Sequence, residues 1–216
     1  MRKLSEKLSL GNICIGDFIS KWYETHPTFV SYGAVDSISY KAQRSKFKKE
    51  SAVFIGRLDE QTGGLTYAKA VEKVKKYYPN FEYVVVGDGK DRKQIEKNFK
   101  VLGFQKNPEK YFQKYRFAFV SRYLSILEAL AAQKLIFAVY DNSIKKDYLT
   151  MAPFAKWIII EKDPQILADK ISYYLKNPKA EKKLTEDGFQ WVTKQTWENL
   201  VALYLQLWRI KQNATS

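Results

Sequence analysis

Short apolar runs alternate with longer amphipathic stretches along the chain from residue 51 onward. The apolar runs are continuous, which is typical of strands that are buried on both faces of a sheet. They predict strands at 52–55, 81–86, 100–104, 116–120, 135–140 and 156–160. Apolar residues at helical spacing predict helices at 65–78, 92–98, 123–132 and 143–151, helices that begin near 163 and 179, and a helical turn from 108.

Strands that alternate with helices indicate a parallel sheet with helices on both faces. The predicted fold class is therefore α/β, a doubly wound, Rossmann-like parallel sheet, and we assign it to residues 51–195. Ligands of such sheets bind beyond the carboxyl ends of the strands, so candidate binding residues are sought there.

Residues 1–50 do not continue this pattern, and we expect them to form a separate segment and a linker. The segment contains a helical stretch, 17–24, and a strand-to-turn segment, 28–33. The basic run at 41–49 is typical of a solvated linker, with an arm that binds nucleic acid as the alternative.

Residues 196–216 are predicted to form an amphipathic helix and a tail. A helix over 197–210 places five apolar residues on one face: Trp197, Leu200, Tyr204, Leu207 and Trp208. Such a stripe usually packs into a core, but at the end of a chain it is also a candidate docking surface.

Composition narrows the classes of function. The 216 residues include 37 Lys and Arg against 23 Asp and Glu, and the net charge of +14 predicts attraction to anions without identifying them. Cys14 is the only cysteine, which excludes an intrachain disulfide and a Cys-based zinc site. His26 is the only histidine, which excludes a multi-histidine metal site and leaves one candidate for a histidine-dependent nucleophilic mechanism.

The chain lacks a signal-peptide pattern, and its apolar runs are far shorter than the ~20 residues that span a bilayer. We therefore expect a soluble protein of the reducing cytoplasm. The basic charge would also suit a peripheral position on the inner face of a membrane.

The first predicted strand end carries Gly56 and Arg57, followed just before the next helix by Thr62, Gly63 and Gly64. Glycines allow close backbone approach, a helix N-terminus offers unpaired N–H groups, and an arginine can bind phosphate oxygens. An ordinary turn with a surface arginine would show the same residues, so the motif alone is weak.

The second strand end is Gly87-Asp88-Gly89. It does not match the dinucleotide-binding fingerprint, because position 92 is Arg where that pattern needs Gly. A tight turn is the simpler interpretation, and contact with a ligand is the alternative.

The third strand end runs through Ser121, Tyr123, Leu124 and Ser125 into a helix with Glu128 among apolar residues. A carboxylate in such surroundings is costly unless it is paired or faces a ligand. Ribose hydroxyls are suitable partners, because an ionised carboxylate can accept two hydrogen bonds from them. A salt bridge to a nearby Lys or Arg is the alternative.

Together, the three strand ends suggest a pocket for a nucleoside diphosphate. The segments 53–59, 83–89, 100–104 and 121–129 resemble the C-terminal, donor-binding domain of GT-B glycosyltransferases. They are similar in particular to the large retaining group often called family 4, which includes sucrose and glycogen synthases and bacterial mannosyl- and glucosyltransferases. The resemblance extends over about residues 28–208, with the motifs in the same order.

The resemblance implies transfer of a glycosyl unit from a nucleotide-diphospho-sugar to an acceptor with retention, without a metal ion or other cofactor. Arg57 would stabilise the departing diphosphate, and Glu128 would hold the ribose. Backbone groups at Gly87–Gly89 would lie near the base, and those around Tyr123–Ser125 near the phosphates. The other candidate substrate-binding residues are Gly56, Thr62, Gly63, Gly64, Asp88 and Ser121.

The chain departs from the family pattern in three places. Thr62 occupies the usual position of a lysine, and Leu124 stands where the first of two glutamates is expected, in a loop that is several residues shorter. Only the last fragment of an N-terminal domain, about 11–35, is expected. We therefore expect a donor-binding part that needs a missing or separate acceptor domain, docked through the helix from Trp197 to Trp208, for an unknown sugar or lipid-linked acceptor.

Two other functions stay open. The threonine at position 62 and the short loop would suit a non-catalytic nucleotide-sugar-binding pseudoenzyme or fragment. The net charge of +14 would suit a basic protein associated with membranes or nucleic acid. Nucleic acid is the weaker of these two partners, because the sequence contains no RNA-binding or helix-turn-helix motif.

Overall fold

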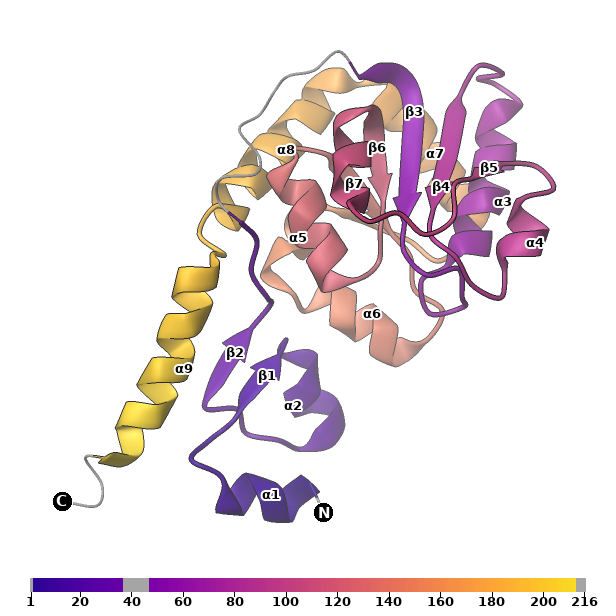
Figure 1. Cartoon of the computed structure of the whole chain (residues 1–216). Helices are drawn as coiled ribbons and strands as arrows, with labels where there is room; N and C mark the ends of the chain where they lie inside the picture. The colour runs from indigo at the N-terminus through magenta and orange to yellow at the C-terminus, as the bar shows by residue number, and fades with distance from the viewer. Residues whose placement is uncertain (1, 37–46, 213–216) are drawn as a thin grey trace.

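The computed structural model describes residues 2–36 and 47–212. Figure 1 shows an α/β body that contains the larger sheet, and a small N-terminal unit that lies beside the last helix. Within the described ranges, no helix is both long and apolar enough to cross a membrane.

The strands of the body form one parallel sheet. They are β3 (Lys48–Ile55), β4 (Glu82–Val86), β5 (Lys100–Val101), β6 (Tyr115–Phe119), β7 (Leu135–Ala138) and β8 (Ile159–Ile160). Their order across the sheet is β5-β4-β3-β6-β7-β8, and neighbouring strands are parallel. This order confirms the doubly wound sheet and places its switch point between β3 and β6, where ligands of such folds bind.

Helices cover both faces of the sheet (Figure 1). On one face α3 (Gly64–Lys75) packs against α7 (Pro164–Lys176), and on the other α5 (Tyr123–Ala131) packs against α8 (Pro178–Val192). The shorter helical segments are α4 (Arg92–Ile95), α6 (Ser143–Thr150) and the 3₁₀ segments η1 (Pro108–Gln113) and η2 (Pro153–Trp157).

The core lies on both sides of the sheet. Along β3, Val53 and Ile55 pack on the α5 side, whereas Ala52 and Phe54 pack on the α3 side. Successive side chains of a strand point to opposite faces, so a strand covered on both faces must be apolar throughout. This is the physical reason for the continuous apolar runs in the sequence.

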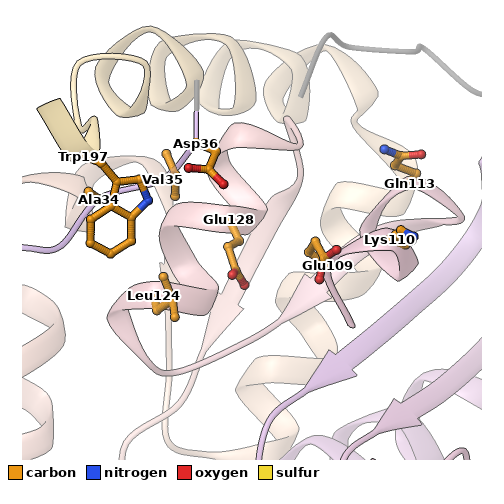
Figure 2. Close-up of a pocket in the computed structure, with 9 residues that line it drawn as sticks. All are labelled: Ala34, Val35, Asp36, Glu109, Lys110, Gln113, Leu124, Glu128 and Trp197. Atoms are coloured by element: carbon orange, nitrogen blue, oxygen red, sulfur yellow. The ribbon is translucent and has the colours of Figure 1, made fainter. Parts of the chain in front are cut away.

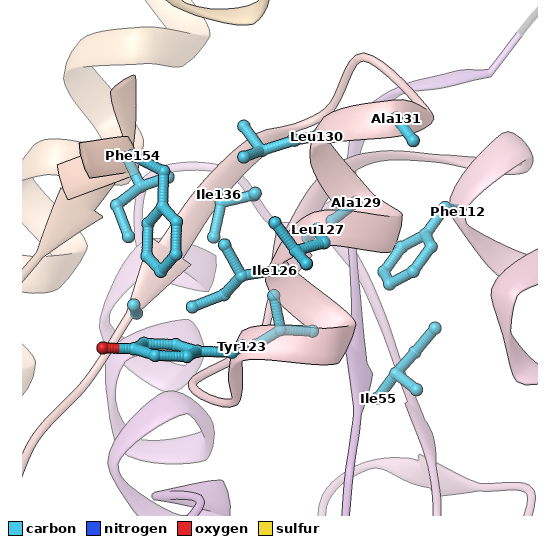
Figure 3. Packing of buried hydrophobic residues seen from close by; sticks show 14 of the residues in the cluster. Ile55, Phe112, Tyr123, Ile126, Leu127, Ala129, Leu130, Ala131, Ile136 and Phe154 are labelled. Atoms are coloured by element: carbon cyan, nitrogen blue, oxygen red, sulfur yellow. The ribbon is translucent and has the colours of Figure 1, made fainter. Parts of the chain in front are cut away.

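Helix α5 is largely buried. Figure 3 shows Ile126, Leu127 and Leu130 of this helix packed among Ile136 and Phe154 from neighbouring elements. Complete burial of one large apolar side chain contributes about 1.5–3 kcal/mol, so several such residues fix the position of the helix.

The N-terminal unit contains α1 (Arg2–Leu8), β1 (Ile13–Ile15), α2 (Phe18–Tyr23) and β2 (Phe29–Ser31). The two strands pair in parallel. The last helix, α9 (Trp197–Gln212), contacts this unit, because a Cβ atom on Gly11 would lie 2.6 Å from Cδ1 of the buried Leu207. The helix predicted at 17–24 and the strand predicted at 28–33 are confirmed, whereas α1 and β1 were not predicted.

Several element boundaries differ from the predictions. The strand predicted at 100–104 ends after two residues, because the chain turns through Gly103 with a φ of +69°. The strand predicted at 156–160 is shortened to β8 because Pro153 begins η2. Of the predicted basic linker, residues up to 46 lie outside the described residues, and Lys48 and Lys49 already belong to β3.

A substitution at Gly87 tests how closely the chain after β4 approaches the loop after β3. Gly87 and Gly33 both have positive φ. A Cβ atom added to Gly87 would overlap the Gly56 carbonyl oxygen, whereas a Cβ atom added to Gly33 would lie 3.4 Å from Cδ1 of Leu127. We expect Gly33→Ala to lower the free energy of unfolding by about 1 kcal/mol. Gly87→Ala should lower it by about 3 kcal/mol or more in urea denaturation, and equal losses would contradict the close approach.

Candidate functional site

The loops that follow β3 and β4 lie directly on each other. Cβ atoms added to Gly87 and Gly89 would overlap the carbonyl oxygens of Gly56 and Leu58, and the Leu58 N–H donates to the Asp88 carbonyl at 2.8 Å. The Asp88 carboxylate pairs with Arg92 at 2.7 Å. Gly87 and Gly89 are therefore required by contact between two loops, as in the simpler interpretation of a tight turn.

Thr62 holds the loop that presents Arg57. The Thr62 hydroxyl is buried within hydrogen-bond distance of the carbonyl oxygens of Arg57 and Asp59. Asp59 also accepts from the Thr62 N–H at 3.1 Å and pairs with Nε of Arg57 at 3.1 Å. The guanidinium of Arg57 stays exposed, whereas the hydroxyl of Thr62 is turned into the loop and shapes it.

Gly63 and Gly64 begin α3. Gly63 has left-handed φ and ψ values of 75° and 27° directly before the helix, a conformation that glycine adopts without steric penalty. An added Cβ would also meet the Val139 side chain, so these two glycines turn the chain into the helix in a crowded position.

Two arginines meet at the switch point between β3 and β6. The side-chain oxygen of Gln61 accepts a hydrogen bond from Arg122 at 2.7 Å and one from Arg57 at 3.5 Å. Arg122 is the residue directly before α5. It was not among the predicted site residues, although its position immediately after a strand end was a signal that could have identified it.

A hollow of about 680 Å³ lies beside these residues and is lined by Gln61, Arg122 and Lys145, together with Trp22 of the N-terminal unit and Tyr148 of α6. Nζ of Lys145 donates to the Ser121 carbonyl oxygen and lies 4.1 Å from the centre of the Tyr148 ring. Burial and the neighbouring Arg122 charge lower the pKa of Lys145 to about 7. No motif in the sequence identified this lysine.

Ser121 and Tyr123 support the start of α5 from inside the fold. The Ser121 hydroxyl accepts from the Val139 N–H at 2.9 Å and pairs with the Tyr67 hydroxyl at 2.8 Å. The Tyr123 N–H donates to the Tyr148 hydroxyl at 2.6 Å. Both side chains are buried, and the Tyr123 N–H, one of the backbone groups that we expected near the phosphates, already has Tyr148 as its partner.

The next two N–H groups of α5 belong to Leu124 and Ser125. The first hydrogen bond within the helix is donated by Ile126, to the Arg122 carbonyl at 2.8 Å. The N–H groups of Leu124 and Ser125 therefore have no partner inside the helix, as is general for a first helical turn, and such groups favour anions.

Glu128 lines a second hollow, of about 500 Å³, on the other side of the start of α5. Figure 2 shows Glu128 among residues from several elements, with Leu124 one helical turn away, Glu109 from η1, Asp36 from the segment after β2, and Trp197. Burial, followed by the repulsion of Glu109, raises the pKa of Glu128 to about 7. Among the described residues, no Lys or Arg pairs with this carboxylate, so the salt bridge considered from the sequence is absent from this part of the chain.

The predicted site residues are thus arranged in two groups around the start of α5. Arg57 meets Arg122 through Gln61 on one side, and Glu128 and Leu124 line the smaller hollow on the other. Gly87–Gly89 line neither hollow. A carboxylate, cations and free backbone N–H groups within one region are the groups that sugar hydroxyls and phosphates require.

Among known families, "Glycosyl transferases group 1" matches residues 37–191. The chain belongs to this family. A relative of known activity is an alpha-1,4-N-acetyl-D-galactosaminyltransferase of Campylobacter jejuni, named for an acceptor linked to PP-undecaprenol. It is 38% identical over 72 residues, a match that covers 32% of this chain and 19% of the relative.

Solved structures share the fold of this group 1 chain. Anabaena HepE, in complex with UDP and glucose, superposes with a TM-score of 0.71 at 14% identity over 99% of this chain and 65% of its own. The C-terminal domain of the group 1 protein LpcC from Francisella tularensis superposes with a TM-score of 0.56 at 16% identity over 75% of this chain and 98% of its own. The chain therefore spans less than two thirds of HepE and about a fifth of the Campylobacter relative.

The raised pKa of Glu128 predicts how stability depends on pH. Relative to a neutral side chain at this position, the wild-type carboxyl has no cost below about pH 4.5, becomes increasingly destabilising as pH rises from about 4.5 to about 7, and keeps that full cost at higher pH. We expect Glu128→Gln to leave the free energy of unfolding nearly unchanged near pH 4 and to raise it by about 1–2 kcal/mol at pH 8. The exposed Glu186→Gln should change it little at either pH, and a Glu128→Gln effect that is the same at both pH values would contradict the burial of the charge.

Proposed function

We propose that this chain is the donor-binding part of a glycosyltransferase and holds a nucleotide-diphospho-sugar across the start of α5. The observation that carries this proposal is Glu128, a partly buried carboxylate with no cation paired to it in the described part of the chain, lining a hollow beside a helix start. Such a group is costly unless a ligand supplies hydrogen-bond donors. The two adjacent hydroxyls of a ribose would do so.

The remaining roles follow from the position of Glu128. With the ribose on this carboxylate, the diphosphate extends along the first turn of α5, where the N–H groups of Leu124 and Ser125 lack helical partners. Arg57 lies across the switch point and stabilises the negative charge that develops on the diphosphate as it leaves. The sugar–diphosphate bond breaks, an acceptor hydroxyl oxygen bonds to the same sugar carbon with retention, as the resemblance to family 4 implies, and the proton of that hydroxyl passes to the departing diphosphate.

A non-catalytic nucleotide-sugar-binding protein is the second candidate. The observation that favours it is the inward position of the Thr62 hydroxyl, because no cation occupies this loop position. Both candidates require the same donor pocket, and transfer to an acceptor distinguishes them.

The N-terminal unit suggests that the acceptor side is incomplete in this chain. Its β1–β2 pair is parallel and three residues long on each side, whereas parallel strands occur almost only in larger, covered sheets. On α9, Trp197, Val201, Tyr204, Leu205 and Trp208 are all exposed. We propose that the remainder of an N-terminal acceptor domain, in this protein or in a partner chain, extends the small sheet and covers this stripe.

The donor pocket is tested by calorimetric titration of the chain with UDP, GDP and ADP. One of the three should bind saturably, and Glu128→Ala should weaken its binding by about tenfold or more, because hydrogen bonds to a charged group are worth about 1.5–3 kcal/mol. Arg57→Ala should weaken it as well, while the exposed Glu186→Ala should leave it unchanged. Binding that is indifferent to both Glu128 and Arg57 would refute the proposed pocket.

The exposed stripe of α9 is tested by sedimentation of the isolated chain at increasing concentration. A contiguous apolar surface promotes association, so we expect the chain to self-associate and a Trp197→Glu/Trp208→Glu variant to stay monomeric. Tyr77→Glu, at an aromatic residue that is 81% exposed after α3, should not change the association. If the wild-type chain is monomeric at every concentration, this result contradicts the proposal that a further domain covers the exposed stripe of α9.

A further inference from the structure

Arg122 and Lys145 are neighbouring cations without a salt-bridge partner among the described residues, although Asp141 lines the same hollow. Both line the hollow of about 680 Å³ beside the switch point. The hydrogen bond of Arg122 is to the neutral Gln61 side chain, and that of Lys145 is to the Ser121 carbonyl oxygen. Within the described ranges, no carboxylate pairs with either of them at salt-bridge distance.

The surroundings make this arrangement unfavourable for the empty protein. Burial and the Arg122 charge lower the pKa of Lys145 to about 7, and the charges of Asp141 and Asp59 offset this only in part. The partly buried Lys145 and the exposed Arg122 repel each other, and a bound anion would offset that repulsion.

The two cations also lie where a second phosphate of the donor would be. Arg122 directly precedes α5, and Leu124 in the first turn already lines the Glu128 hollow. Gln61 connects Arg122 to Arg57. A diphosphate that runs from a ribose on Glu128 along this turn therefore ends between Arg57 on one side and Arg122 and Lys145 on the other.

We propose that Arg122 and Lys145 bind the distal phosphate of the donor and supply the positive charge that Thr62 lacks. This inference rests on the proposed donor pocket and adds two residues to it. The planar guanidinium of Arg122 is suited to bidentate contact with phosphate oxygens, and the ammonium of Lys145 acts as a compact point charge. The aromatic rings of Trp22 and Tyr148 line the same hollow.

The test compares a nucleoside diphosphate with the matching monophosphate by calorimetry, using UDP and UMP, GDP and GMP, and ADP and AMP. Arg122→Gln and Lys145→Met should each weaken the diphosphate about tenfold or more and the monophosphate no more than about threefold. The matched control is Lys146→Met, at the next residue of α6 on its exposed side, which should change neither affinity. Arg122→Lys, which keeps the charge, should retain part of the diphosphate affinity.

The outcomes separate this inference from the proposed function. If the wild type prefers the diphosphate and the Arg122→Gln/Lys145→Met variant keeps that preference, the two cations do not bind the distal phosphate, and the donor pocket stands. If the wild type binds none of these nucleotides, the donor pocket fails, and this assignment fails with it. Arg122 is exposed, so Arg122→Gln gives a decisive result even if Lys145→Met does not fold.

Discussion

The burial of α5 against the sheet is the constraint on which the candidate site depends. Ile126, Leu127 and Leu130 fix this helix in the core, and its start is held by the Tyr123 N–H bonded to Tyr148. Once the helix is fixed, Leu124 and Glu128, four residues apart, must share one face. Both therefore line the smaller hollow, while the residue before the helix, Arg122, faces the larger one.

The same burial places opposite charges in unfavourable surroundings on the two sides of the helix start. Desolvation raises the pKa of Glu128 and lowers that of Lys145, each to about 7, so both groups are less stable in their charged forms than in water. Perturbed groups of this kind cluster at functional sites. A ligand with hydroxyls at one end and phosphates at the other would stabilise both at once.

The strands of the sheet could be predicted from the sequence because the apolar pattern of a buried strand is a local property of the chain. A strand covered on both faces has to be continuously apolar, and 52–55, 81–86 and 135–140 show this directly. Glu128 was identifiable for a related reason, since a carboxylate is conspicuous within an apolar helix. The parallel sheet and the helices on both of its faces then followed from the alternation of strands and helices, whereas the order of the strands became known only from the structure.

The parts that the sequence did not reveal depend on contacts between distant segments. The inward hydroxyls of Thr62 and Ser121 are visible only once the loop and the core around them have formed. Lys145 is separated from Arg122 by α5, β7 and a loop, so its position beside Ser121 appears only in the fold. The strand β1 was missed as well, because its three residues are identified as a strand by their pairing with the distant β2.

The proposed donor pocket is tested most directly by a crystal structure of the chain with the nucleoside diphosphate that binds it. We expect ribose hydroxyls within hydrogen-bond distance of the Glu128 carboxylate. We also expect the diphosphate along the first turn of α5, with Arg57 and Arg122 on either side. A nucleotide bound elsewhere on the chain, with the Glu128 hollow empty, would contradict the proposed pocket.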